Sequence, residues 1–522
     1  MFILLTVLFL FATALTLAAL QVWRRGFRFT WLIAAGGAFL TWSSVLLWQA
    51  VMPVRLELPA WEPAGLFADS PLFFADRLVW PYAFSLTTLA LAVILTEVVS
   101  EDFPNPLSWA GTLTLTGLGL LAVLADNPLT LALAWAAIDL TELIIQLRAV
   151  RQPSASERVV TAFASRAVGI GLLLWASMVS QAAGEPLDFQ NTLPQAGLYL
   201  LAAAGLRLGV LPLHLPLPSE SALRRGFGTA LRLVSAASSL VLLARIPPAS
   251  MASGFTPVLF ILAAVAGIYG GWMWIRSSDE LAGRPFWMIG LASLAVASAL
   301  RGNPTGAAAW SAALVLAGGA LFLSPFSQRW LDRVLLAGVW VLSSLPFSPT
   351  AAGWESDAPA NWAVWVTWPF FLLTQGFLIS GYIRHARQRP AAALTSKPLW
   401  AGNVYPAGIA LLLLTAVSLG FFGWDGSGRV GAWTFGLIAA ALAAALVWLT
   451  PRLRILNPAR AHWIRPEAGG SRLDAFYRGL WSLYQAFGRL SAGISATLEG
   501  EGGVLWTLLM LALFISLLSR TP

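Results

Sequence analysis

The chain has 522 residues, of which 58% are hydrophobic and 11% charged, and its mean hydropathy is +0.74. A soluble protein of this length could not bury so much apolar surface, which excludes a soluble globular protein. With no cysteine, this chain can supply no disulfide, iron–sulfur cluster or thiolate metal site. Cationic cytoplasmic loops account for the net charge of +8, which gives no reason to expect nucleic acid binding.

Apolar runs of about 20 residues recur along the chain, the length that crosses ~30 Å of hydrocarbon as a helix. These solid runs exclude a transmembrane barrel, whose strands alternate apolar and polar residues. The sequence therefore predicts an all-α polytopic membrane protein with about 14–16 transmembrane helices. The predicted spans are residues 2–22, 30–52, 78–98, 107–125, 128–148, 160–181, 193–213, 227–247, 254–275, 285–300, 305–324, 330–347, 361–383, 403–423, 430–450 and 502–519.

The charges of the connecting segments predict the orientation in the membrane. Cations follow the first and fifth spans, and acidic residues follow the second and sixth. By the positive-inside rule, residues 23–28 and 149–158 lie in the cytoplasm, and the N-terminus lies outside. Residues 53–77, which contain several prolines and aromatic residues, are expected to form an ordered external loop. We expect an integral protein of a bacterial-type cytoplasmic (inner) membrane.

Lys397 is the only lysine, and it lies in a polar segment between two apolar runs. The other basic side chains, apart from three widely separated histidines, are arginines. Arginine stays charged at any physiological pH. Any proton transfer through this chain would therefore depend on carboxylates, histidine and water.

Residues 203–245 are the most informative for function. Arg207 lies deep in the seventh predicted span, where a charge is costly unless it faces a cavity or a carboxylate. Pro212 removes a backbone donor and predicts a helix break just after it, which Pro218 extends. A broken helix beside polar groups is a common way to build an ion path. Alternatively, Arg207 lies near a span end and snorkels to the interface.

The run from Arg207 through Pro212-Leu213-His214 to Leu242-Leu243-Ala244-Arg245 resembles a family motif. It is similar to the central motif of the antiporter-like proton-translocating subunits of respiratory complex I, membrane-bound hydrogenases and multisubunit sodium/proton antiporters. In that family a lysine stands five residues before the proline of Pro-Leu-His, and Arg207 occupies that place here. Segments 126–135, 162–169 and 345–353 are also similar to the family, so the resemblance covers roughly residues 80–385.

The resemblance implies two inverted five-helix repeats that contain broken helices and are connected by buried charges at mid-membrane. Pro346 and Pro349 mark the expected break in the second half. In residues 471–495, arginines between apolar groups at helical spacing predict an amphipathic helix along the membrane or a partner; the alternative is a plain connector. The predicted organisation is 1–106 N-terminal spans, 107–247 first repeat, 248–384 second, degenerate repeat, 385–470 C-terminal spans and loops, and 471–522 amphipathic helix and terminal span.

The chain departs from the family at several charged positions. Trp135 is followed by Ala136 where the family has a glutamate, and the second half lacks the lysine or glutamate expected after Leu-Pro-Pro. Asp139 and Glu142, three residues apart and hence on one helix face, could restore a carboxylate. Alternatively, they are fixed counter-ions of arginines. A mid-membrane Arg207 should lie within a few ångströms of one of these two acids, because an unpaired charge there is too costly.

The resemblance implies a membrane subunit of a complex I-type (NADH–quinone oxidoreductase-like) or related complex, in which proton translocation is coupled to electron transport. Other membrane subunits and the lipid bilayer are the implied partners. The alternatives are a non-conducting structural subunit and a partner in sodium/proton antiport or inorganic carbon uptake. We assign no catalytic residue, cofactor or metal to this chain. The candidate proton-path residues are Asp139, Glu142, Arg166, Arg207, His214 and Arg232, and the candidate helix-break residues are Pro212, Pro218, Pro346 and Pro349.

Overall fold

A computed structural model describes most of the chain up to residue 449. The described residues are 2–24, 27, 29–59, 70–99, 105–149, 153–215, 225–326, 329–355, 362–388, 399–424 and 433–449. They lie within one unit of the chain, Met1–Asn457. Four predicted features lie outside the described residues: Pro218, Lys397, the amphipathic helix 471–495 and the terminal span 502–519.

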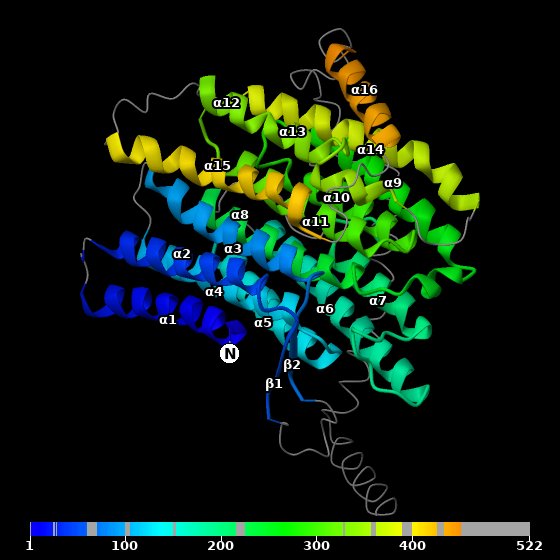
Figure 1. Cartoon of the computed structure of the whole chain (residues 1–522), viewed down its shortest axis with the longest axis horizontal. Coiled ribbons are helices and arrows are strands. Elements are labelled where there is room, and N and C mark those ends of the chain that lie inside the picture. Colours follow the sequence, from blue (N-terminus) through cyan, green and yellow to red (C-terminus); the bar gives the residue numbers. More distant parts are fainter. Residues whose placement is uncertain are drawn as a thin grey trace, which may run out of the picture. The chain divides into compact units, whose positions relative to one another are not determined.

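The described residues are mostly helical, and the long helices pack side by side (Figure 1). The α-helices are α1 (Phe2–Trp23), α2 (Thr30–Trp48), α3 (Trp80–Thr96), α4 (Pro106–Leu124), α5 (Pro128–Ala149), α6 (Pro153–Ala182), α7 (Pro194–Arg207), α8 (Arg225–Leu243), α9 (Thr256–Arg276), α10 (Arg284–Leu300), α11 (Pro304–Phe322), α12 (Arg329–Leu335), α13 (Ala337–Leu342), α14 (Trp362–Arg387), α15 (Leu399–Phe422) and α16 (Trp433–Leu449). The 3-10 helices are η1 (Glu97–Val99), η2 (Pro248–Ala252) and η3 (Pro349–Trp354).

Eleven of the described helices are long and apolar enough to cross a membrane, and α10 and α16 are shorter apolar helices. The prediction of a polytopic helical membrane protein is therefore confirmed. The sequence predicted 16 spans. Those that are not among these eleven are α10, α16, the terminal span and two segments, 193–213 and 330–347. The structure interrupts both of those segments, because α7 ends at residue 207 and α12 and α13 are short.

Burial divides the helices into a centre and a periphery. In α3, α8 and α11, 94% of the most apolar stretch is buried, against 28% in α1 and 33% in α6. Most exposed residues of α1 are large and apolar, including Leu4, Leu8 and Leu15. Since hydrocarbon is as apolar as leucine, such an outer face is suited to lipid. Charged groups on the central helices are thereby kept away from lipid.

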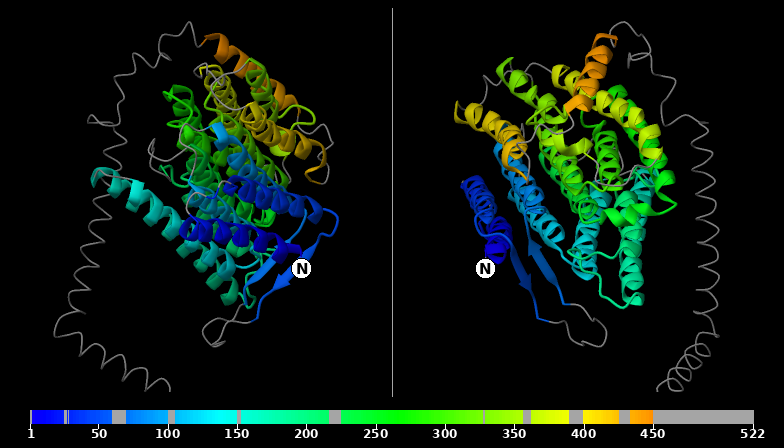
Figure 2. Two further views of the ribbon diagram at one scale, coloured as in Figure 1. Left: turned by 90° about the vertical axis from the view of Figure 1, so that its left-hand side faces the viewer. Right: turned by 45° about the vertical axis from the view of Figure 1, so that its right-hand side comes forward.

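The connection between α2 and α3 contains a β-hairpin, which the all-α prediction missed. Strands β1 (Val54–Glu57) and β2 (Leu72–Ala75) pair antiparallel at one end of the bundle (Figure 2). An isolated two-stranded hairpin is marginally stable at best. Here it is held by the segment before α5 and by the first turn of α5: the Asp126 N–H donates to Leu72 O (3.0 Å), and the Leu72 N–H donates to Thr130 Oγ1 (2.9 Å).

The first interruption follows α7 and begins earlier than we predicted. Gly209 has a positive φ of 73°, a conformation in which a side chain would be strained. Its N–H donates to Leu206 O, and the Val210 N–H donates to Gly205 O. This is a Schellman termination, which ends the helix at Arg207. The prediction of a break just after Pro212 was wrong in position, because a glycine cap precedes the proline.

The second interruption lies between α13 and α14, where Pro346 and Pro349 predicted it. Residues 343–348 are not helical, and Pro349 begins η3. The Thr350 Oγ1 atom donates to Val341 O (2.8 Å) and accepts from the Ser344 N–H (3.0 Å). These bonds satisfy backbone groups that the break frees, as a buried interruption requires.

Candidate functional site

Three helices, α5, α6 and α7, bring charged residues together where α7 ends. Arg207, the last residue of α7, reaches Asp139 of α5 through two charged hydrogen bonds. Nη1 lies 2.6 Å from Oδ2, and Nη2 lies 2.9 Å from Oδ1. Both side chains are buried. The predicted pairing of Arg207 with a carboxylate of the fifth span is confirmed, and the interpretation that it snorkels to the interface is wrong.

The remaining contacts of Arg207 fix its orientation. Nε donates to Ser239 Oγ of α8 (3.1 Å), and Nη1 also donates to the carbonyl of Arg166 (3.2 Å). Its guanidinium carbon lies 4.2 Å from the ring centroid of Trp135, a cation–π distance. A Cβ at Gly169 of α6 would lie 2.6 Å from Arg207 Cγ. Glycine is therefore what lets this side chain run against α6.

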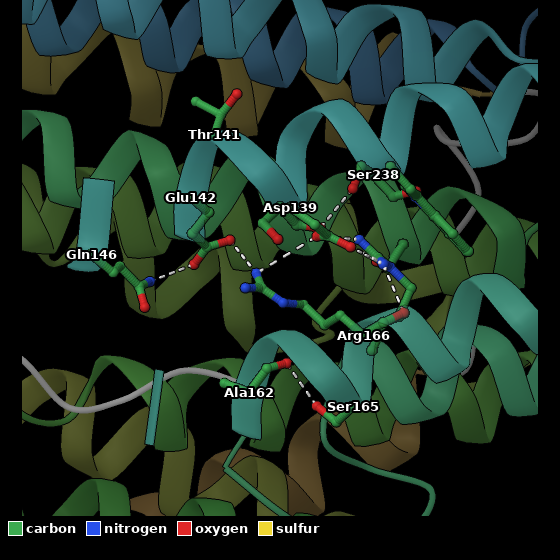
Figure 3. A network of polar contacts seen from close by, with 12 residues as sticks. Asp139, Thr141, Glu142, Gln146, Ala162, Ser165, Arg166 and Ser238 are labelled. Carbon is green, nitrogen blue, oxygen red and sulfur yellow. Dashed lines mark hydrogen bonds and ion pairs between the residues drawn. The ribbon is translucent and has the colours of Figure 1, made fainter. Parts of the chain in front are cut away.

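Arg166 of α6 forms the second ion pair and lies between the two acids (Figure 3). Its Nη1 donates to Glu142 Oε2 and lies 3.8 Å from Asp139 Oδ1. The other oxygen of Glu142 accepts from Gln146 Nε2 at 2.7 Å. We call Asp139, Glu142, Arg166 and Arg207 the charge cluster. Its two carboxylates and two guanidinium groups balance in charge, which offsets the cost of burying them.

Sequence reasoning missed the neutral residues that support the charge cluster. Gln146 lies four residues after Glu142, so helical spacing alone places it on the same face of α5. Trp135 is also on α5, and its Nε1 donates to Ser238 O of α8 (3.0 Å). Ser239 gives no comparable signal, because only the packing of α8 against α7 brings it to Arg207.

The other two candidates lie outside the direct contacts of the cluster. Arg232 of α8 is 1% exposed, and it is close enough to Glu142 for their opposite charges to attract. His214 is half-buried, and its Nδ1 lies 2.9 Å from Pro212 O. Among the described residues, no hydrogen bond joins His214 to Asp139 or Glu142. The fold therefore brings four of the six candidates into direct contact.

The second interruption is built differently from the first. Gln375 of α14 accepts from Trp354 Nε1 (3.1 Å) and donates to Leu342 O (2.7 Å) and Ser344 Oγ (2.9 Å). Arg301 donates to the carbonyl of Gly353 at 2.6 Å. A neutral amide thus holds the second break, where the first has an ion pair.

At the hairpin end, outside the spans, polar side chains join four connecting segments. Gln190 Nε2 donates to Asp126 Oδ1 (2.7 Å), and Arg245 pairs with Asp76 (2.7 Å). Burial raises the pKa of Asp126, and the hydrogen bond from Gln190 opposes that rise. In the described parts of the chain, no group of three His, Asp or Glu side chains could hold a metal ion.

No protein family and no curated protein matches the sequence, but solved structures match the fold. One is a chain of the Mrp complex from Dietzia sp. DQ12-45-1b, with 16% identity and a TM-score of 0.73 over 100% of this chain and 63% of that one. Another belongs to respiratory complex I from Thermus thermophilus with bound aureothin, with 16% identity and a TM-score of 0.58 over 84% of this chain and 99% of that one. This chain has the fold of an antiporter-like membrane subunit.

A third match comes from the membrane-bound sulfane sulfur reductase, an archaeal respiratory membrane complex. The identity is 12% and the TM-score 0.63, over 98% of this chain and 100% of that one. This chain spans 63% of the length of the Mrp chain, and 99% and 100% of the lengths of the other two. The antiporter-like fold therefore accounts for nearly all of this chain.

Proposed function

We propose that this chain is a membrane subunit of a multisubunit ion-translocating complex, and that its first half carries protons through the charge cluster. The observation that carries this proposal is the burial of two acids and two arginines at the end of the interrupted helix α7. Ionisable residues inside a membrane bundle are costly and usually mark ion pathways. The antiporter-like fold, found in chains of respiratory complexes, supports the same function.

Within the cluster, the acids would carry the protons and the arginines would stay charged. Arg166 contacts Glu142 and lies 3.8 Å from Asp139, so a small movement of its side chain changes which acid it neutralises. Protonation of Glu142 would weaken its contact with Arg166 and favour the contact between Arg166 and Asp139. In this scheme Arg166 couples the two acids, while Arg207 holds the Asp139 carboxylate in place through two hydrogen bonds.

We further propose that residues 107–247 and 248–384 are the two inverted repeats. In each range, one segment is interrupted, and the interruption follows α7 in the first and α13 in the second. The first contains the charge cluster and the second the neutral Gln375 contacts. Proton transfer is therefore assigned to the first range, and the second would stabilise the complex.

A non-conducting structural subunit is the second candidate. Each cluster acid contacts an arginine, and such contacts favour a permanently ionised carboxylate. In that case the cluster would only hold α5, α6 and α7 together. The two candidates differ in whether neutral acids at positions 139 and 142 abolish proton transport.

The test is the double variant Asp139→Asn/Glu142→Gln in the reconstituted native complex. We expect assembly to persist and proton translocation per turnover of the complex to be lost. Asp279→Asn, which neutralises an exposed acid outside the cluster, is the control and should pump normally. Unchanged pumping by the double variant would favour the structural subunit.

Copurification from native membranes would identify the partners. We expect other membrane subunits of a respiratory or antiport complex, in a bacterial-type cytoplasmic membrane. Recovery of this chain alone under conditions that preserve known membrane complexes would contradict a role as a subunit.

A further inference from the structure

The second interruption contains two residues in a backbone conformation that L-amino acids rarely adopt. Ser344 has a φ of 54°, and Phe347 has a φ of 64°. The left-handed region is costly for any residue with a Cβ, and a bulky side chain such as phenylalanine is an outlier there. Such a conformation persists only where the surrounding structure holds it, and it is common in segments that switch between states. We call residues 343–348 the strained segment.

Helices α15 and α16 touch the strained segment at both of these residues. A Cβ at Gly436 of α16 would overlap Ser344 O, and a Cβ at Gly420 of α15 would overlap Phe347 O. The rings of Phe347 and Phe421 also stack, with their centroids 5.5 Å apart. The two glycines therefore let α15 and α16 lie directly against the backbone of the segment.

Of these two helices, α16 is the one that can move with less loss of packing. In α15, 56% of the most apolar stretch is buried, whereas the buried residues of α16 are Gly436, Ala439 and Ala443. Figure 1 shows α16 at the edge of the helices. Since dispersion contacts between side chains are what hold a membrane helix in its bundle, a helix with few buried residues is held weakly.

We propose that the strained segment is a gate to the interior of the second half, and that Gly436 of α16 keeps it closed. While α16 is in place, its contact with Ser344 O maintains the left-handed conformation. When α16 moves away, the segment relaxes and water reaches side chains that are now enclosed, such as Ser348 at 1% exposure. The gate does not depend on proton transfer through the charge cluster, so the two proposals fail separately.

A thiol reporter tests the gate, because the chain has no cysteine of its own. Ser348→Cys places a thiol within the strained segment, and Ser348 Oγ makes no hydrogen bond among the described residues that the exchange would break. The measurement is the rate of labelling of the full chain in detergent by a water-soluble maleimide. Gly436→Ala should displace α16 and raise this rate roughly tenfold to a hundredfold, the factor that overpacking of a close contact predicts.

Two controls separate opening of the gate from general loosening. Gly402→Ala on α15, where a Cβ would have no atom within 4 Å, should leave the labelling rate unchanged. Ser180→Cys on α6 is a second buried reporter, and its serine also makes no hydrogen bond in the described part of the chain. Gly436→Ala should not affect labelling at position 180. Equal labelling of Ser348→Cys with and without Gly436→Ala would overturn the gate, as would an equal rise at both reporters.

Strain in the closed gate is tested with Gly436 in place, by comparing Ser344→Gly with Ser344→Ala. Both variants lose the hydrogen bond from Gln375 to Ser344 Oγ, but only glycine adopts a positive φ without steric cost. The Ser348→Cys reporter should therefore be labelled roughly fivefold more slowly in Ser344→Gly than in Ser344→Ala. Equal rates in the two variants would show that strain does not drive opening and would overturn this mechanism.

Discussion

Replacement of Arg207 tests the energetics of the charge cluster directly. Arg207→Met removes one partner of a buried pair and leaves Asp139 without its bidentate donor. Breaking such a pair costs roughly 3–5 kcal/mol. We expect about 3 kcal/mol, the lower end of that range, because Arg166 lies only 3.8 Å from Asp139 and can partly neutralise it.

A second substitution separates the unpaired charge from simple loss of packing. Arg207→Met/Asp139→Leu replaces both charges by apolar groups, an exchange that is often nearly neutral. We expect the double variant to recover most of the lost stability in reversible unfolding by SDS in mixed micelles. Arg387→Met, at the exposed end of α14, should change stability by less than about 0.5 kcal/mol. Equal destabilisation of the single and double variants would refute the reasoning, because the cost would then not come from the buried carboxylate.

Three further predictions concern packing, pH and orientation. Gly169→Ala should destabilise the chain by about 1–3 kcal/mol, because its Cβ would overlap Arg207 Cγ. Gly171→Ala, whose Cβ would have no atom within 4 Å, should leave the Tm unchanged. Equal Tm values for the two variants would contradict this prediction. Because burial raises the pKa of Asp126, stability attributable to this group falls as pH rises from the unfolded pKa to the folded one. Asp126→Asn should therefore raise Tm at pH 7 and by less at pH 4, and an equal gain at both would count against it. A cysteine at Gly65 should react with an impermeant reagent in intact cells, and reaction only after lysis would reverse the orientation.

Sequence reasoning predicted the charge cluster better than the backbone around it. An arginine within an apolar run is so costly that it requires a nearby acid, and Asp139 and Glu142 were the acids at helical spacing on the fifth span. Spacing could not decide between them. The structure assigns Asp139 to Arg207 and Glu142 to Arg166, a choice that depends on how α6 packs against α7.

The local backbone was harder to predict, because capping competes with proline as a cause of helix ends. Gly209 ends α7 through a Schellman motif, three residues before the proline that we expected to break the helix. The hairpin was missed for a related reason. Its strands are only four residues each, Val54–Glu57 and Leu72–Ala75, and they are stabilised by contacts with the segment before α5 and with its first turn. Such tertiary contacts leave no periodic signal in the sequence.

The balance of charge in the cluster limits how a proton can be stored there. With both acids ionised the net charge is zero, and because both bases are arginines, neither can release a proton to compensate. A proton arriving at Glu142 would leave an uncompensated unit charge in a medium of low polarisability, where self-energy is high. Loading would therefore require a simultaneous displacement of positive charge elsewhere along the bundle. The fraction of clusters that hold a proton would therefore depend on the membrane voltage.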